Sequence, residues 1–231
     1  MIRLVLAFIC LSGVARGVTL KPEPRLCTEF FRSDLVFSGK VISATRAKED
    51  KDGIGGWDYR IQVENMFRGE PQEFVTVFTE NSSGRYMLKM QHEYLLFADN
   101  IKGRMWISDG GNNRDVTGKN DKFDDVKLVI SNNKAGKPGD IRGWLGNDDG
   151  MVKGSGFGVT VEATDGKRHF TAVVNNKGWF HIYVPAGTYQ VVPHSSEKYE
   201  IIPFDLSYND PNHVVVECGG CGEVAFRARR R

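Results

Sequence analysis

Cysteine is the residue type in this sequence with the clearest potential for chemistry. The chain contains Cys10, Cys27, Cys218 and Cys221, and the last two form a Cys-Gly-Gly-Cys motif. Such a pair is a redox centre when its first thiol lies at the N-terminus of a helix in a βαβ unit. Here strand-like runs precede and follow the motif. We therefore expect a hairpin turn. Either its two cysteines form a disulfide with each other, or one of them pairs with Cys27.

The remaining reactive side chains form no recognisable site. The five histidines lack the spacing of metal ligands, and His181 fits better as a half-exposed strand residue. Acidic clusters at residues 121–125 and 148–149 lack the alternating oxygen ligands of a calcium loop, so we expect solvated turns. A zinc site would need a fourth ligand besides the three downstream cysteines. No HExxH, GxSxG, phosphate-loop or GxGxxG motif occurs. The sequence predicts no catalytic residue, no metal, no cofactor and no enzymatic activity.

The first 17 residues have the pattern of a cleavable signal peptide. Arg3 precedes an apolar run at residues 4–14, and Ala15 and Gly17 are the small residues that a signal peptidase recognises. Cleavage after Gly17 predicts a secreted or periplasmic protein. The apolar run is too short to span a bilayer comfortably, and no other stretch could, so we expect no transmembrane segment. Cleavage removes Cys10 and leaves an odd number of cysteines, at least one of them unpaired in the monomer.

Composition and patterning favour a β-rich globular protein. Hydrophobic residues make up 40% of the 231 residues and charged residues 26%, with a net charge of +2 that suggests no nucleic-acid partner. The basic residues 227–231 could contact anionic lipid or polysaccharide, although we expect a solvated terminus. An extended arm is expected over residues 18–26 and a linker over residues 134–138.

Short strands recur on both sides of the linker, with turn residues between them. Gly39 lies inside the first strand and predicts a bulge. Residues 121–131 are the best helix candidate, with Asn120 or Asp121 as its cap. The expected strands are 35–44, 57–67, 74–79, 93–98, 105–108, 141–145, 159–163, 170–174, 179–184, 188–192, 214–216 and 223–226. This pattern predicts an all-β protein.

Three segments before the linker carry a family resemblance. Cys27 is followed at residues 34–41 by Asp-Leu-Val-Phe-Ser-Gly-Lys-Val, residues 59–69 end in Phe-Arg-Gly, and residues 92–98 are His-Glu-Tyr-Leu-Leu-Phe-Ala. In this order they resemble the netrin-like fold, most closely the bacterial relatives of the tissue inhibitors of metalloproteinases. The resemblance implies that residues 27–133 form a five-stranded OB-type barrel with a flanking helix.

That family implies a candidate partner-binding edge at Cys27 and Thr28. In the animal inhibitors the mature chain begins with the cysteine, whose free amine and carbonyl clamp the zinc of the protease. Here cleavage after Gly17 leaves nine residues ahead of Cys27. Two other cysteines of the family have no counterpart, since Ser82-Ser83-Gly84 and Asp109-Gly110-Gly111 stand at their places.

The segments after the linker resemble a second family. Residues 141–144 are Ile-Arg-Gly-Trp, residues 158–161 are Gly-Val-Thr-Val, residues 178–180 are Gly-Trp-Phe and residues 185–189 are Pro-Ala-Gly-Thr-Tyr. Together they resemble the carboxypeptidase regulatory-like, transthyretin-like domain. The resemblance implies that residues 139–231 form a transthyretin/Ig-like β-sandwich, an accessory module without catalytic groups.

The function that these features favour is that of an exported, non-catalytic accessory protein that binds a protein or a glycan. The alternative is a metalloprotease inhibitor that acts through the Cys27 edge of the barrel. A third hypothesis is a thiol–disulfide enzyme that uses Cys218 and Cys221. We therefore expect an unidentified protein partner, such as a protease, or a glycan, and no nucleic acid.

Overall fold

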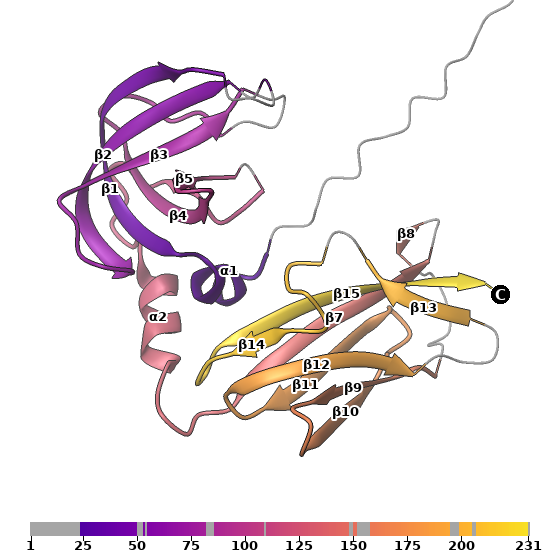
Figure 1. Ribbon diagram of the computed structural model, residues 1–231. Coiled ribbons are helices and arrows are strands. Elements are labelled where there is room, and N and C mark those ends of the chain that lie inside the picture. Colours follow the sequence, from indigo (N-terminus) through magenta and orange to yellow (C-terminus); the bar gives the residue numbers. More distant parts are fainter. Residues whose placement is uncertain are drawn as a thin grey trace, which may run out of the picture.

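The structure is a computed structural model that describes residues 24–49, 53, 55–81, 86–108, 110–147, 150–151, 158–194, 199–204 and 207–230. The expected signal peptide (residues 1–17), its cleavage site and most of the expected arm (residues 18–26) lie outside these residues. Strands dominate the described part and are arranged in several sheets, with two helices beside them (Figure 1). The prediction of an all-β protein is confirmed.

The first half, which we define as residues 27–133, builds one sheet. Its strands are β1 (Leu35–Ala47), β2 (Gly56–Arg68), β3 (Phe74–Glu80), β4 (Glu93–Ile101), β5 (Arg104–Trp106) and β6 (Arg114–Asp115). β1 pairs with β2, β2 with β3, β3 with β5, β5 with β4, and β4 again with β1. The hydrogen-bonded pairing thus passes through five strands and returns to the first. Alternate residues such as Phe37, Ile61 and Leu96 form its buried core.

Gly39 allows β1 to pair with two strands at once. The register between β1 and β2 shifts between Ser38 and Gly39, so the predicted bulge is confirmed. A Cβ atom at Gly39 would lie 2.3 Å from the carbonyl oxygen of Gln62. Only glycine permits this close approach of the two backbones, and the bend lets the same segment also pair with β4.

Two helices cover the outer face of β1 and β4. Helix α1 (Leu26–Arg32) was not predicted, and helix α2 (Asp124–Asn132) begins three residues later than expected, with Phe123 at its N-cap instead of Asn120 or Asp121. Phe30 of α1 and Val126 of α2 pack in one cluster with residues of β1 and β4. Neither N-cap residue makes a side-chain capping hydrogen bond, so tertiary packing stabilises both short helices.

The second half, residues 139–231, contains two sheets. Its strands are β7 (Gly139–Asn147), β8 (Gly150–Met151), β9 (Thr160–Thr164), β10 (His169–Val173), β11 (Trp179–Val184), β12 (Gly187–His194), β13 (Tyr199–Pro203), β14 (Val214–Val216) and β15 (Cys221–Arg230). One sheet has the order β10-β9-β12-β14, and the other has the order β11-β7-β15-β13, with β8 paired to β7. Side chains from both sheets share one core, including Ile141, Ile182, Tyr189 and Val214. Strand β13 was not predicted.

A side chain at Gly39 should damage the first half. We expect Gly39→Val to lower the free energy of unfolding by about 1–3 kcal/mol or more, because its Cβ would collide with the backbone of β2. Gly110→Ala is the control, since a Cβ at Gly110 meets no atom within 4 Å. Denaturant unfolding measures both. Equal stability of the two variants would contradict the bulge.

Candidate functional site

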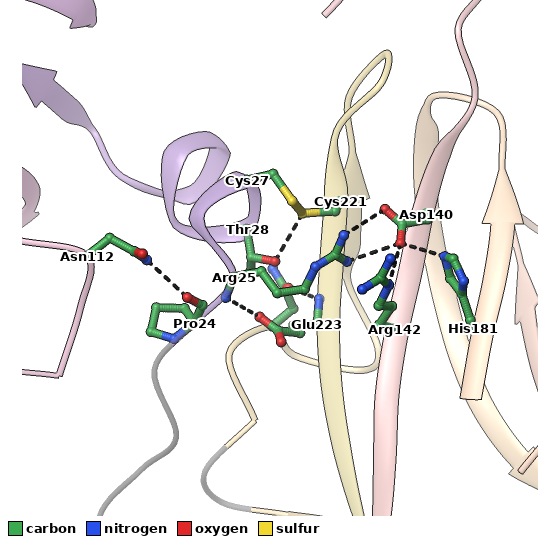
Figure 2. The surroundings of a disulfide bond; sticks show 11 residues. Pro24, Arg25, Cys27, Thr28, Asn112, Asp140, Arg142, His181, Cys221 and Glu223 are labelled. Atoms are coloured by element: carbon green, nitrogen blue, oxygen red, sulfur yellow. Dashed lines mark hydrogen bonds and ion pairs between the residues drawn. A yellow bond between two sulfur atoms is a disulfide. The ribbon is translucent and has the colours of Figure 1, made fainter. Parts of the chain in front are cut away.

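A disulfide joins the two halves of the chain. Cys27 lies in α1, Cys221 is the first residue of β15, and their sulfur atoms are bonded with the Cα atoms 5.8 Å apart (Figure 2). The cysteines are 194 residues apart in sequence. Cys218 is free and partly exposed. Of the pairings left open by the sequence, the structure therefore contains Cys27–Cys221 and not a ring within Cys-Gly-Gly-Cys.

Thr28 is buried beside the disulfide. Its side-chain oxygen lies 3.2 Å from the sulfur of Cys221, and the residue is 2% exposed. The two residues of the expected partner-binding edge, Cys27 and Thr28, thus face the second half.

Arg25, the N-cap residue of α1, makes a second connection to the second half. Its backbone N–H donates to Glu223 Oε2 at 2.9 Å, and its guanidinium donates to both carboxylate oxygens of Asp140 at 3.1 and 3.3 Å (Figure 2). Arg142 Nε also donates to Asp140 at 3.1 Å. His181 Nε2 lies 2.6 Å from the same carboxylate, an ion-pair distance without hydrogen-bond alignment. Asp140 is therefore in contact with three side chains: Arg25 from the segment just before α1, Arg142 from its own strand and His181 from β11.

Arg68 closes the other end of α1. It is the last residue of β2, and its guanidinium donates to the carbonyl oxygens of Ser33 at 3.0 Å and Phe31 at 2.9 Å. The same group lies 3.5 Å from Glu217 of the second half. Arg68 thus satisfies carbonyl groups at the C-terminal end of the helix and adds a contact across the junction.

The two glycines of the cysteine motif have a packing role. A Cβ atom at Gly219, whose φ is +63°, would lie 2.0 Å from the carbonyl oxygen of Asn132 at the end of α2. At Gly220 it would lie 3.0 Å from the ring of Phe31. The motif is a turn, as expected. The prediction that this turn closes a hairpin was wrong, because β14 and β15 belong to different sheets. The turn carries the chain from one sheet to the other while fitting against the first half.

A cleft of about 290 Å³ opens at the junction. Its lining residues come from both halves and combine cationic, polar and apolar groups. They are Thr28, Phe31, Arg32 and Arg68 from the first half, and Asn209, His213, Val215, Glu217 and Cys221 from the second. Val215 is 48% exposed. Concave sites between packed units are common ligand sites, so this cleft is the first candidate for contact with a partner.

A buried carboxyl group holds α1 against its own half. Glu29 is 2% exposed, and Asn112 donates to it at 2.6 Å from both its backbone N–H and its side-chain amide. Burial raises the pKa of Glu29 above the usual 4.5, and this effect outweighs the hydrogen bonds from Asn112, which lower it. The amide of Asn112 also donates to Pro24 O at 3.0 Å (Figure 2). The loop around Asn112 therefore positions the segment that leads to the disulfide.

Several of the histidines and acidic residues that the sequence analysis considered as metal ligands form ion pairs within the protein. His169 and His194 flank Glu162 at 3.0 and 3.6 Å, and Asp125 pairs with Arg114 at 2.6 Å. Within the described residues, no group of three or more histidine, cysteine, aspartate or glutamate side chains is placed to hold a metal ion. Residues 148–149 lie outside those residues.

Sequence reasoning missed Arg25, Asp140 and Arg68. Arg25 and Asp140 are 115 residues apart, and isolated charged residues give no pairing signal over such a distance.

No protein-family model and no curated protein matches the chain. In the part of the chain that the structure describes, neither helix is long and apolar enough to cross a membrane.

Removing the disulfide should loosen the junction. We expect the double variant Cys27→Ala/Cys221→Ala to lose about 2–5 kcal/mol of unfolding free energy, because the bond closes a very long loop. Cys218→Ala is the matched control and should be close to wild type, since Cys218 is free. Denaturant unfolding without reductant measures the difference.

Proteolysis of the linker tests directly whether the disulfide connects the two halves, independently of its effect on stability. Proteolytic cleavage within residues 134–138 should leave the two halves together on a non-reducing gel and release them after reduction. Release without reductant would show that Cys27 and Cys221 are not bonded in the protein.

The buried Glu29 should produce a pH-dependent difference in stability. Because its folded-state pKa is raised, its stabilising contribution is present below about pH 4.5 and is lost as the pH rises through the folded-state value. Compared with Glu29→Gln, the wild type should therefore lose unfolding free energy between about pH 4 and about pH 7. Unfolding curves at both pH values test this, with exposed Glu70→Gln as control. A pH-independent difference would contradict the burial effect.

Proposed function

We propose that this chain is an exported, non-catalytic accessory protein whose two halves act as one unit to bind a protein or glycan partner. The observation that carries the proposal is the Cys27–Cys221 disulfide. Structural disulfides persist in oxidising compartments outside the cytoplasm, and the signal-peptide pattern of residues 1–17 points the same way. The bond connects the OB-type barrel and the transthyretin-like sandwich that the sequence resemblances imply.

The junction supports a unit with a fixed geometry. Besides the disulfide, the backbone and the guanidinium of Arg25 hold the second half, and Arg68 reaches Glu217. The cleft between the halves exists only while this arrangement is kept, because both halves line it. A partner that binds in the cleft would therefore contact both halves.

The geometry supports this function more than the alternatives. A zinc clamp needs a free terminal amine at the cysteine, whereas Pro24 and Arg25 precede Cys27 and the N–H of Arg25 is bonded to Glu223. A dithiol enzyme would use Cys218 and Cys221 as a pair, whereas Cys221 is bonded to Cys27. A structural role for Cys27 and Cys221 accounts for both observations.

Mass spectrometry of the protein from an extracytoplasmic fraction tests export. We expect a mature chain that begins at Val18 and a disulfide-linked peptide pair containing Cys27 and Cys221. A chain that keeps residues 1–17, stays in the cytoplasm and has both cysteines reduced would overturn the proposal. A mature chain that begins at Cys27 would favour the inhibitor instead.

Partner binding tests the second part of the proposal. Protein and glycan arrays probed with the oxidised mature protein should give a ligand whose affinity falls in the double variant Cys27→Ala/Cys221→Ala but not in Cys218→Ala. Binding that is unaffected by loss of the disulfide would contradict action as one unit. The absence of any ligand on both arrays would contradict a binding function.

A further inference from the structure

The outer face of the β11-β7-β15-β13 sheet carries an unusual set of side chains. Along β11, Phe180 and Ile182 point into the core, so Trp179, His181 and Tyr183 lie on the opposite, outer face. The pairing with β7 places Trp144 opposite Trp179. Each strand thus contributes aromatic or polar residues to the same surface.

Aromatic rings cross this face from strand to strand. We call Trp179, Trp144 and Phe204 the aromatic row. Trp144 is opposite Trp179 in the pairing of β7 with β11. Phe204 directly follows β13, and its ring centroid lies 5.1 Å from that of Trp144. The guanidinium of Arg227 lies over the Phe204 ring at 4.6 Å. Trp179 is 40% exposed, so part of its ring is available for contact with a ligand.

A polar row lies beside the aromatic row. It consists of His181, Arg142 and Glu223, which are adjacent on β11, β7 and β15. Asp140 accepts a hydrogen bond from Arg142 at 3.1 Å and lies 2.6 Å from His181 Nε2 (Figure 2). The polar side chains are therefore positioned before any ligand arrives, which lowers the entropy cost of binding.

The charge of this surface is biased toward cations. The carboxylate of Asp140 already contacts Arg25, Arg142 and His181, and that of Glu223 accepts the N–H of Arg25. Arg142 is 48% exposed at its side chain and uses Nε for Asp140, so its terminal nitrogens have no partner among the described residues. These donors can bind a carboxylate of a ligand in the bidentate geometry typical of arginine.

We propose that this face binds an acidic oligosaccharide, one whose sugars carry carboxylates. A pyranose ring has an apolar C–H face, which can stack on Trp179 and Trp144, and a rim of hydroxyl groups, which can bond to the polar row. A uronate carboxylate complements Arg142. A long, regular sheet surface suits an extended chain of sugars. The inference rests on the proposed function, since it names one class of ligand for an exported binding protein.

Tyr183 extends the surface along the edge strand. It is 68% exposed, and its ring lies 4.3 Å from that of His181. β11 is the last strand of its sheet, so a long polymer can run past Trp179 and Tyr183 without meeting another strand of that sheet. The tyrosine adds a second stacking position on the same strand as Trp179.

Titration of the oxidised mature protein with an oligogalacturonate tests the proposal. Tryptophan fluorescence and calorimetry should both report binding, and the fully methyl-esterified oligomer, which lacks the charge, should bind more weakly. Trp179→Ala should weaken binding by about tenfold or more, as expected for loss of one stacking ring. Arg142→Gln should remove the preference for the acid over the ester.

Val173→Ala is the matched control for these variants. Val173 is 65% exposed and belongs to β10 in the other sheet, so its truncation should leave binding unchanged. Equal binding by Trp179→Ala and Val173→Ala would overturn the proposed surface, and equal binding of acid and ester would overturn the acidic ligand. Tighter binding of a single-stranded oligothymidylate than of the sugar acid would assign the face to nucleic acid instead.

The outcome can be separated from that of the proposed function. A mature, disulfide-bonded chain that binds no sugar acid but binds a protein through the junction overturns this inference and leaves the proposed function intact. A chain that is retained in the cytoplasm overturns the proposed function, whatever it binds. Near-ultraviolet circular dichroism confirms that each variant is folded, so weak binding cannot be confused with unfolding.

Discussion

The arrangement of this protein depends on one covalent constraint, the disulfide between Cys27 and Cys221. The bond fixes the short helix α1 on the first residue of β15, although the two cysteines are 194 residues apart. A helix of 7 residues with no side-chain cap has little stability of its own. Its position is instead set by the disulfide on one side and by the packing of Phe30 against the first half on the other. The helix thus serves as the rigid connector between the halves.

The ion pairs around the disulfide contribute orientation more than stability. Arg25 and Asp140 are partly buried, with side chains 24% and 13% exposed, so loss of hydration offsets much of their attraction. Their hydrogen bonds are directional, however, and hold the segment before α1 at one angle to β7. The disulfide restricts the distance between the halves, while Arg25 and Arg68 restrict their rotation.

The sequence predicts the parts of this structure that follow from local patterns. Alternation of apolar residues identified most strands, and Gly39 marked the bulge, because these features depend on neighbours in the chain. Helix α1 and strand β13 were missed because their formation depends on distant partners, such as Cys221 and β15. The pairing of Cys27 could not be chosen from spacing, since three cysteines allow several bonds. The partners of Asp140 come from three separated segments, which no local pattern reveals.

Asp140 links the junction to the outer sheet face. Its carboxylate binds Arg25, which belongs to the junction, and it also positions Arg142 and His181, which belong to the polar row (Figure 2). If Arg25 left Asp140, the carboxylate would gain a free oxygen and the negative charge on the polar row would increase. An acidic ligand would then meet a less favourable surface. The contact that orients the two halves therefore also neutralises Asp140, so the closed junction and the cationic character of the face depend on the same residue.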